Sequence, residues 1–306
     1  MKKFSEKQTG ILARSDLRTP KGKIIYWCFF AILVCVCLIA IIPMIWTIAT
    51  SFKSVGEIYD NTSFFPKNIG ISDAIKRISY VWKILDLGRS MINTIILSIG
   101  SCLITLIVCG FGGYAISKIK PKGFTVVTML VLWTIMMPGQ IRTVPQYMSF
   151  LNFPFASTSY GMGVSILDTY WPMWLGTASS AYTVLLFKNA FDGLSDSYVE
   201  AARIDGATNI DIFFRIMFPL SIPIVVYVSI GIINGTWSNF FTPYLVLSDS
   251  KLYVTPLKIY LIKMDSSIKI NDYLMGLIFA TIPPFIMFAI FQKQIMGGIN
   301  VGGVKG

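Results

Sequence analysis

Long runs without a single charged residue dominate the sequence. The first, residues 24–52, is longer than the stretch of about 20 apolar residues that a helix needs to cross a bilayer. Only 13% of the 306 residues are charged, whereas soluble proteins carry about 25%. The mean hydropathy of +0.66 agrees with this pattern. The sequence therefore predicts an integral membrane protein.

Six such segments predict an all-α, polytopic membrane protein with six transmembrane helices. Residues 1–23 form a polar, basic tail, and residues 24–306 form the six-span domain. The stretch 143–167 is also free of charge, so a re-entrant piece between the third and fourth spans is an alternative. The predicted spans are residues 24–52, 90–117, 123–150, 169–190, 216–246 and 273–292.

Three lysines in one short loop indicate the orientation. Lys118, Lys120 and Lys122 separate the second and third spans. Because short cytoplasmic loops are enriched in Lys and Arg, this loop is expected inside the cell. Both termini are then cytoplasmic, in a multi-pass protein of the cell membrane. The loop 53–89 is external, with a short amphipathic helix over residues 71–85.

The composition argues against several other classes. The net charge of +11 does not indicate nucleic-acid binding, because many of the basic residues lie beside spans as topology signals. The sequence has no histidine, and its five cysteines show no metal-ligand spacing or disulfide framework. No Walker A motif is present, although the chain ends in a glycine-rich segment. We expect no catalytic site, metal or cofactor in this chain.

One polar segment, residues 195–217, lies between the fourth and fifth spans. Ser197 and Glu200 fit a capping box at the start of a helix, and Gly206 permits a left-handed turn. Thr208 begins a second helix over residues 209–217, with an ion pair between Asp211 and Arg215. The apolar side of this helix is Ile212, Phe213, Ile216 and Met217.

The fifth span has a polar centre. Polar side chains at membrane depth are costly unless they face protein or a watery path. Amides, hydroxyls and an indole together can bind the hydroxyls of a sugar and stack on its apolar face. These side chains can also join helices or line a kink. The candidate pathway residues are Asn234, Trp237, Ser238, Asn239 and Tyr244.

The polar segment resembles the EAA loop of permease subunits in ATP-binding-cassette importers. The resemblance lies in Glu200-Ala201-Ala202, in Gly206 after three intervening residues, and in the Ile-Met-Phe-Pro of residues 216–219. The run 200–207 is similar to the carbohydrate branch, specifically the smaller permease subunit of the maltose-importer type. Phe218 departs from the leucine usual in the family. The resemblance extends over most of the chain.

This resemblance implies a cytoplasmic coupling helix that docks onto an ATPase. The expected partners are a second homologous permease subunit, two P-loop ATPase subunits that bind ATP and Mg, and an extracytoplasmic solute-binding protein. The substrate is expected to be a sugar, specifically an oligosaccharide, and the loop 248–253 is expected to reach toward the binding protein. The residues that would contact the ATPase are Glu200, Ala201, Ala202, Asp205 and Gly206.

Two other kinds of transporter remain open. An importer permease for peptides, amino acids or another small solute would share the loop. A secondary transporter can also have bent helices and a polar midplane, but it usually places an ionisable residue within its spans. A membrane enzyme would need a nucleophile and base or metal ligands near one face. The charge-free runs offer no ionisable residue for coupling, and the sequence has no histidine and few acidic residues within its spans.

Overall fold

The computed structural model describes residues 19–60, 63–67, 70–157 and 163–297. Most of the predicted basic tail and most of the glycine-rich C-terminal segment lie outside the described residues. The chain divides into two units, which are described separately. The first consists of residues 1–78 with 269–275, and the second of residues 79–268 with 276–306.

The first unit is built on α1 (Pro20–Ser51) and α2 (Val55–Asp60). It also contains residues 71–78 of α3 (Ile71–Ile84) and residues 270–275 of α15 (Ile270–Gly297). Nearly all of the side chains of α1 are exposed, as expected for a helix surrounded by lipid.

Polar contacts join the elements of the first unit. The guanidinium of Arg77 donates to the carbonyl oxygen of Ser51 at 2.8 Å and pairs with the carboxylate of Asp272 at 2.9 Å. Asn271 donates its side-chain amide to the carbonyl oxygen of Lys53 at 2.9 Å. These bonds close the C-terminal end of α1, whose last carbonyl groups no longer have partners within the helix.

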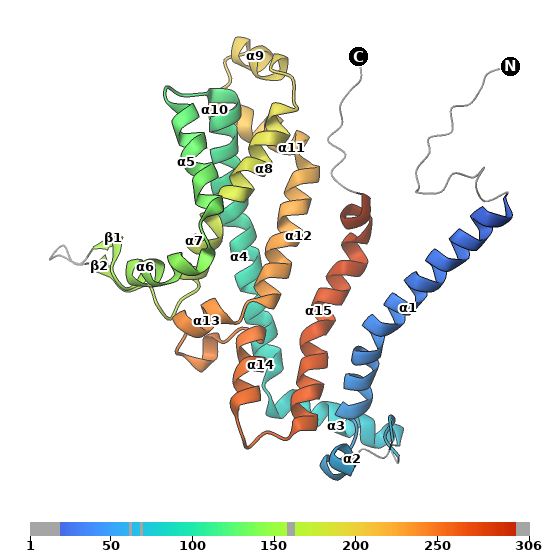
Figure 1. Ribbon diagram of the computed structural model, residues 1–306. Helices are drawn as coiled ribbons and strands as arrows, with labels where there is room; N and C mark the ends of the chain where they lie inside the picture. The colour runs from blue at the N-terminus through green and yellow to red at the C-terminus, as the bar shows by residue number, and fades with distance from the viewer. Residues whose placement is uncertain (1–18, 61–62, 68–69, 158–162, 298–306) are drawn as a thin grey trace. The chain divides into compact units, whose positions relative to one another are not determined.

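The second unit is organised around α4 (Leu87–Tyr114), which continues into the π-helical turn η2 (Ala115–Ile119). The helices α7 (Trp171–Ala178), α8 (Ala181–Asp192) and α12 (Ile222–Ser238) pack along it (Figure 1).

Glycines on α4 allow its neighbours to approach closely. A Cβ atom at Gly100 would lie 2.3 Å from the Trp174 ring, and one at Gly113 would lie 2.6 Å from Phe187 Cβ. Helices in membranes commonly use small residues where their backbones come near each other. Gly100 and Gly113 are therefore positions where α4 approaches α7 and α8 closely.

The remaining helices and strands are short. The helix α5 (Phe124–Met136) precedes α6 (Gly139–Leu151), and β1 (Phe153–Ser157) pairs antiparallel with β2 (Gly163–Val164). The described chain is thus almost entirely helical, as predicted, with one small hairpin. Further along follow α13 (Phe241–Val246), the 3-10 turn η4 (Ser250–Leu252) and α14 (Thr255–Met264).

Length and composition support three to five membrane spans among the described residues. The long helices are Pro20–Ser51, Leu87–Ile119 and Ile270–Lys293. Two further pairs of helices qualify only as bent spans: 124–136 with 139–151, at 107°, and 209–220 with 222–238, at 81°.

The predicted spans 123–150, 169–190 and 216–246 are therefore not continuous helices. The first breaks before Pro138 and α6, where Met137 has extended backbone geometry. The second is interrupted because Ser180 caps the start of α8, its hydroxyl accepting from the Thr183 N–H at 3.2 Å. The third is interrupted at Asn239, whose side-chain oxygen accepts from the Thr242 N–H at 3.2 Å. These side chains offer the backbone an alternative to a continuous helical ladder.

Candidate functional site

The polar segment predicted between the fourth and fifth spans forms two helices joined by a left-handed turn. We call residues 195–217 the coupling segment. It contains α9 (Ser197–Ile204), α10 (Asn209–Ile212) and the π-helical turn η3 (Phe213–Met217), and α11 (Phe218–Leu220) follows. Gly206 has φ +81°, which confirms the predicted left-handed turn. A Cβ atom there would meet no other atom within 4 Å, so the turn requires glycine for its backbone conformation rather than for space.

The two predicted helix starts have different outcomes. The capping box of Ser197 and Glu200 is wrong, because α9 begins at Ser197 itself and follows Asp196, whose side chain makes no capping hydrogen bond. The box of Thr208 and Asp211 is confirmed. Each donates its backbone N–H to the other's side-chain oxygen at 3.2 Å.

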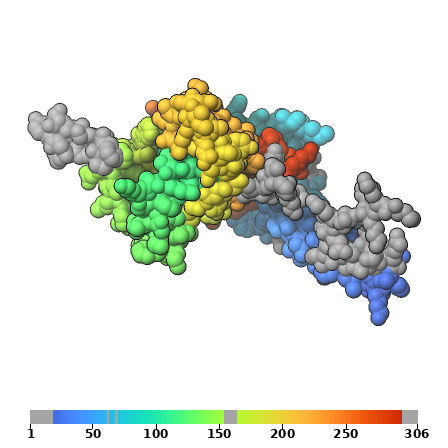
Figure 2. Space-filling model, turned by 90° about the horizontal axis from the view of Figure 1, so that it is seen from above, coloured from blue at the N-terminus to red at the C-terminus, as the bar shows by residue number. Residues whose placement is uncertain are grey.

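The coupling segment has an exposed side and a buried side. Glu200, Ala201, Asp205 and Gly206 are exposed, whereas Ala202 faces inward and is only 7% exposed. Of the two adjacent alanines, Ala201 is therefore the one open to a partner. Seen from this end of the second unit, gold atoms of this part of the chain form its surface beside the green atoms of α5 (Figure 2).

An aromatic cluster anchors the buried side of the coupling segment. Phe213 is fully buried and stacks on Phe111 of α4, with ring centroids 4.0 Å apart. Its ring also lies 5.7 Å from that of Tyr114. Ile212 and Met217 are buried with it, as predicted for the apolar side of this helix. Such packing attaches the second half of the coupling segment firmly to α4.

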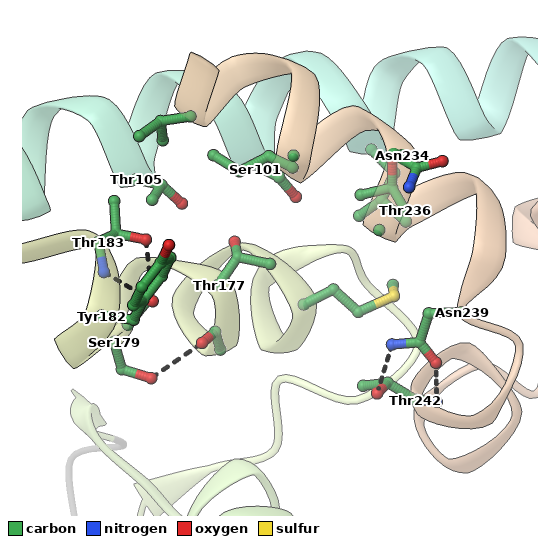
Figure 3. A pocket seen from close by; sticks show the side chains of 18 of the residues that line it. Ser101, Thr105, Thr177, Ser179, Tyr182, Thr183, Asn234, Thr236, Asn239 and Thr242 are labelled. Atoms are coloured by element: carbon green, nitrogen blue, oxygen red, sulfur yellow. Dashed lines mark hydrogen bonds between the residues drawn. The ribbon is translucent and has the colours of Figure 1, made fainter. Parts of the chain in front are cut away.

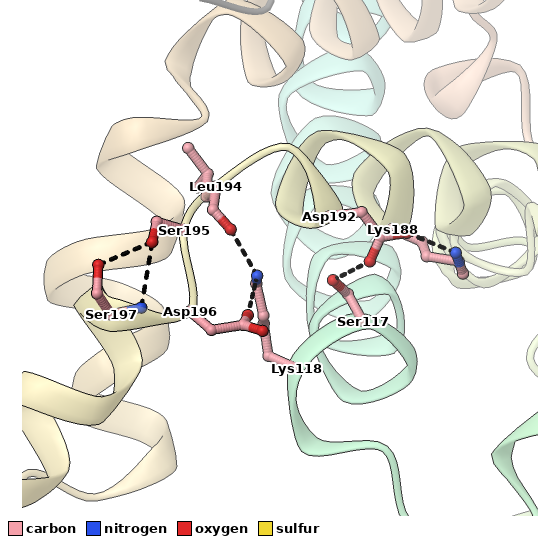
Figure 4. A network of polar contacts seen from close by, with 8 residues as sticks. All are labelled: Ser117, Lys118, Lys188, Asp192, Leu194, Ser195, Asp196 and Ser197. Atoms are coloured by element: carbon pink, nitrogen blue, oxygen red, sulfur yellow. Dashed lines mark hydrogen bonds and ion pairs between the residues drawn. The ribbon is translucent and has the colours of Figure 1, made fainter. Parts of the chain in front are cut away.

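Charged side chains hold the first half of the coupling segment (Figure 4). The ammonium group of Lys118 donates to the carbonyl oxygen of Leu194 at 2.7 Å and pairs with the carboxylate of Asp196. The Lys118 side chain is only 5% exposed. Beside it, Ser117 donates to Asp192 at 2.5 Å, and Lys188 pairs with the same carboxylate at 2.6 Å. We call these contacts the Lys118 network.

Both carboxylates of the Lys118 network stay ionised at neutral pH. Partial burial raises the pKa of Asp192, but hydrogen bonds from Lys188 and Ser117 outweigh this effect and hold the pKa below its usual value. The hydrogen bond and positive charge of Lys118 lower the pKa of Asp196. Because the pKa of each carboxyl group is lower in the folded state, the group stabilises that state at pH values above about 4, the ordinary pKa of Asp. This contribution to stability is lost as the pH falls through the lowered pKa.

A cavity of about 950 Å³ opens within the second unit. Residues of α4, α7, α8, α12 and α15 line it, and hydroxyl and amide groups make up most of its polar surface. Within the described part of the chain, Arg142 is the one charged residue among them. The polar side chains labelled in Figure 3 are Ser101, Thr105, Thr177, Ser179, Tyr182, Thr183, Asn234, Thr236, Asn239 and Thr242.

Two hydroxyl groups in the wall of this cavity have no hydrogen-bond partner among the described residues. They belong to Ser101 and Thr105, which are one turn apart on α4 and at most 1% exposed. Both lie on the side of α4 that faces Thr177 and Thr183 (Figure 3). A buried polar group without a partner in the chain is costly, so these two hydroxyls stand out among the polar groups of α4.

The hydroxyls nearer the start of α4 have partners within the chain. Thr94 contacts the Thr255 hydroxyl at 3.0 Å and accepts from the Thr255 N–H at 2.8 Å. Ser98 lies 2.5 Å from the Thr236 hydroxyl. These two pairs join α4 to α14 and α12, whereas Ser101 and Thr105 remain free for another role.

The structure separates the candidate pathway residues. Asn234 and Asn239 line the large cavity. Trp237 and Ser238 line a second hollow of about 540 Å³ beside α14 and α15. Tyr244 lines neither, and its ring lies 5.5 Å from that of Tyr260.

Sequence reasoning missed the cavity residues of α4 and α8. A signal was present on α4, where Thr94, Ser98, Ser101 and Thr105 recur every three or four residues and so share one face of a helix. Such a polar stripe in a charge-free run indicates a face turned away from lipid.

Known proteins are similar to this chain over most of its length. Residues 80–296 match the family described as binding-protein-dependent transport system inner membrane component. The chain is 28% identical over 214 residues to the arabinooligosaccharides transport system permease protein AraQ of Bacillus subtilis, covering 70% of this chain and 72% of AraQ. It is 27% identical over 305 residues to protein LplC of the same organism, covering 94% and 97%.

A solved structure supports the fold. It is the crystal structure of a bacterial ABC transporter involved in the import of the acidic polysaccharide alginate. The TM-score is 0.71 at 23% identity, with 93% of this chain and 99% of that chain covered. Because the family match extends over more than half of the sequence, this chain belongs to the family of binding-protein-dependent transport system inner membrane components.

Proposed function

We propose that this chain is one of two homologous permease subunits of an ABC importer for oligosaccharides. The observation that carries the proposal is that one helix serves both candidate sites. α4 lines the cavity through Ser101 and Thr105, and its continuation η2 holds the coupling segment through Lys118. A displacement of the coupling segment would therefore move a wall of the cavity.

The chemistry of the cavity favours a polyhydroxylated substrate. Hydroxyl and amide groups can donate and accept hydrogen bonds, and a sugar presents both kinds of partner. The names of similar proteins point the same way. Besides AraQ, they include a starch degradation products permease, AmyC, of Thermoanaerobacterium thermosulfurigenes, which is 27% identical over 268 residues.

The arrangement of helices fits six spans. Counting the α5–α6 pair, the α7–α8 pair and α12 as one span each adds three to the three long helices. The lysines of the α4–α5 turn favour a cytoplasmic position for that turn, and the coupling segment and both termini would then lie on the same side. The protein would then be a multi-pass component of the cell membrane.

Energy would come from partner subunits. Two P-loop ATPase subunits would bind ATP and Mg, and each would receive one coupling segment in a surface cleft. Glu200, Ala201, Asp205 and Gly206 are exposed and available for this contact, while Ala202 supports the ridge from within. Closure of the ATPase pair would move the coupling segment with α4 and switch the cavity between the two sides of the membrane. A solute-binding protein would deliver the sugar.

The substrate class can be tested by uptake into proteoliposomes that contain the complete transporter with its solute-binding protein. Radiolabelled arabino-oligosaccharides, malto-oligosaccharides and oligouronates would be compared with a dipeptide and an amino acid. We expect ATP-dependent uptake of at least one oligosaccharide. Uptake of the dipeptide or amino acid, with no oligosaccharide transported, would contradict the sugar assignment.

Replacing Thr105 with valine should lower sugar uptake without lowering the stability of the fold. The change removes a buried hydroxyl without a partner in the chain, so the free energy of unfolding should stay the same or rise. Sugar uptake should fall about two- to tenfold, the equivalent of one neutral hydrogen bond. Uptake and thermal unfolding in detergent would be measured together.

Thr94→Val is the matched control, because it removes a hydroxyl that accepts from the Thr255 N–H. It should lower the free energy of unfolding by about 1–3 kcal/mol. It should leave the uptake per folded transporter nearly unchanged. Wild-type uptake by Thr105→Val would show that this hydroxyl does not contact the substrate.

A further inference from the structure

The loop between α13 and α14 is exposed at its tip but fixed along its backbone. We call residues 248–253 the docking loop. The side chains of Ser248, Asp249, Ser250 and Lys251 are exposed, and Val254 behind them is fully buried. The loop lies near the end of α4 opposite to the coupling segment (Figure 1). Together, α4 and its π-helical turn η2 are 33 residues long, which corresponds to about 50 Å.

Asp168 holds the beginning of the docking loop. Its backbone has φ +56°, in the left-handed region that side chains other than glycine adopt at a cost, although Asp tolerates it better than most. In this conformation its N–H donates to the Val246 carbonyl oxygen at 2.9 Å. Its carboxylate accepts from the backbone N–H groups of Ser248 and of Asp249, the latter at 3.1 Å.

Other side chains hold the rest of the docking loop. Asn93 of α4 donates to the carbonyl oxygens of Lys251 at 2.8 Å and Tyr253 at 3.0 Å. The Tyr170 hydroxyl donates to the Leu252 carbonyl oxygen at 3.1 Å, and the Tyr253 hydroxyl to that of Ser248 at 3.2 Å. Both N–H bonds of the Asn93 amide are thus used. The docking loop is tied to α4 and to the segment before α7.

We propose that Asp168 is a positioning residue, which holds the docking loop in a preformed shape for the solute-binding protein. The inference rests on the proposed function, and it assigns a role to a side chain outside the cavity and the coupling segment. The family is defined by dependence on a binding protein, and the exposed polar tip offers that partner a surface away from the coupling segment. A loop that is already ordered loses little conformational freedom on binding, so its affinity is higher. Because Asn93 belongs to α4, docking would also act on α4, whose continuation η2 carries Lys118.

Three variants isolate the Asp168 carboxylate. Asp168→Gly removes the acceptor and at the same time relaxes the left-handed backbone, so backbone strain cannot explain its effect. Asp168→Asn keeps an acceptor oxygen at the same place. Asp86→Gly is the matched control, because Asp86 is also left-handed, with φ +46°, and its side chain makes no capping hydrogen bond.

The first readout is the ATPase rate of the reconstituted transporter as a function of the concentration of its purified, sugar-loaded solute-binding protein. Asp168→Gly should raise the half-maximal concentration about tenfold, on the scale of hydrogen bonds to a charged group. It should leave the ATPase rate without binding protein unchanged. In Asp168→Asn and in Asp86→Gly, the half-maximal concentration should stay within about twofold of the wild-type value. A twofold change is less than the loss of one neutral hydrogen bond usually causes.

The second readout is hydrogen exchange of the backbone amides of residues 248–253. Exchange should become faster in Asp168→Gly and stay near wild type in the other two variants. A wild-type concentration dependence in Asp168→Gly would overturn the inference while the proposed function stands. An equal shift in Asp86→Gly would also overturn it, because the effect would then not depend on the carboxylate. If the ATPase rate of the wild-type transporter did not depend on the concentration of the binding protein, the result would contradict the proposed function itself.

Discussion

Replacing Gly113 with alanine should destabilise the second unit. The new Cβ atom would lie 2.6 Å from Phe187 Cβ and 2.8 Å from the backbone nitrogen of Lys188. A backbone atom of α8 cannot move aside as the end of a side chain can. We expect the free energy of unfolding to fall by about 1–3 kcal/mol, the usual cost of overpacking, and uptake to fall with it.

Gly112→Ala provides the control at the adjacent position. Its Cβ atom would meet only the methyl groups of Val184, at 3.4 Å and 3.5 Å, which is close to ordinary van der Waals contact. This variant should unfold at nearly the wild-type temperature in detergent. Equal melting temperatures for the two variants would contradict the close approach of α4 and α8.

Replacing Lys118 with methionine should uncouple ATP hydrolysis from transport. The change keeps the apolar stem of the side chain but removes the ammonium group that holds the carbonyl oxygen of Leu194 and the carboxylate of Asp196. The first half of the coupling segment would then move independently of α4. We expect uptake per ATP hydrolysed to fall about tenfold, on the scale of one lost hydrogen bond to a charged group.

Lys122→Met is the control for Lys118→Met, because Lys122 lies in the same turn and is exposed. It should change neither uptake nor ATP hydrolysis. Both rates would be measured in the same proteoliposomes, with thermal unfolding as a check on folding. Wild-type coupling in Lys118→Met would show that the Lys118 network does not link the coupling segment to α4.

Local signals in the sequence predicted local structure well. The left-handed turn at Gly206 and the capping box of Thr208 and Asp211 each depend on residues at most three apart, and both are present. The capping box predicted for Ser197 and Glu200 is absent, although α9 begins at Ser197. Lys118, far away in the sequence, pairs with Asp196 just before that helix. In the sequence, Lys118 appeared only as an indicator of orientation.

The breaks within the predicted spans were not predicted either. Hydropathy measures how apolar a stretch is, and it does not show whether the backbone continues as one helix. Pro138, Ser180 and Asn239 interrupt helices inside charge-free runs. The separation of the candidate pathway residues was not predicted for a related reason. Neighbouring residues of α12 face different hollows, so Asn234 lines the large cavity and Trp237 the smaller one.

The most direct test of the account is purification of the tagged chain from its native cells in mild detergent, with co-purifying proteins identified by mass spectrometry. Wild type would be compared with Gly206→Val, which places a β-branched side chain where φ is +81°. The account predicts that wild type retains a P-loop ATPase and a second six-span permease, and that the variant loses the ATPase but keeps the second permease. A stable wild-type chain recovered without any ATPase, or an unchanged amount of ATPase with the variant, would contradict it.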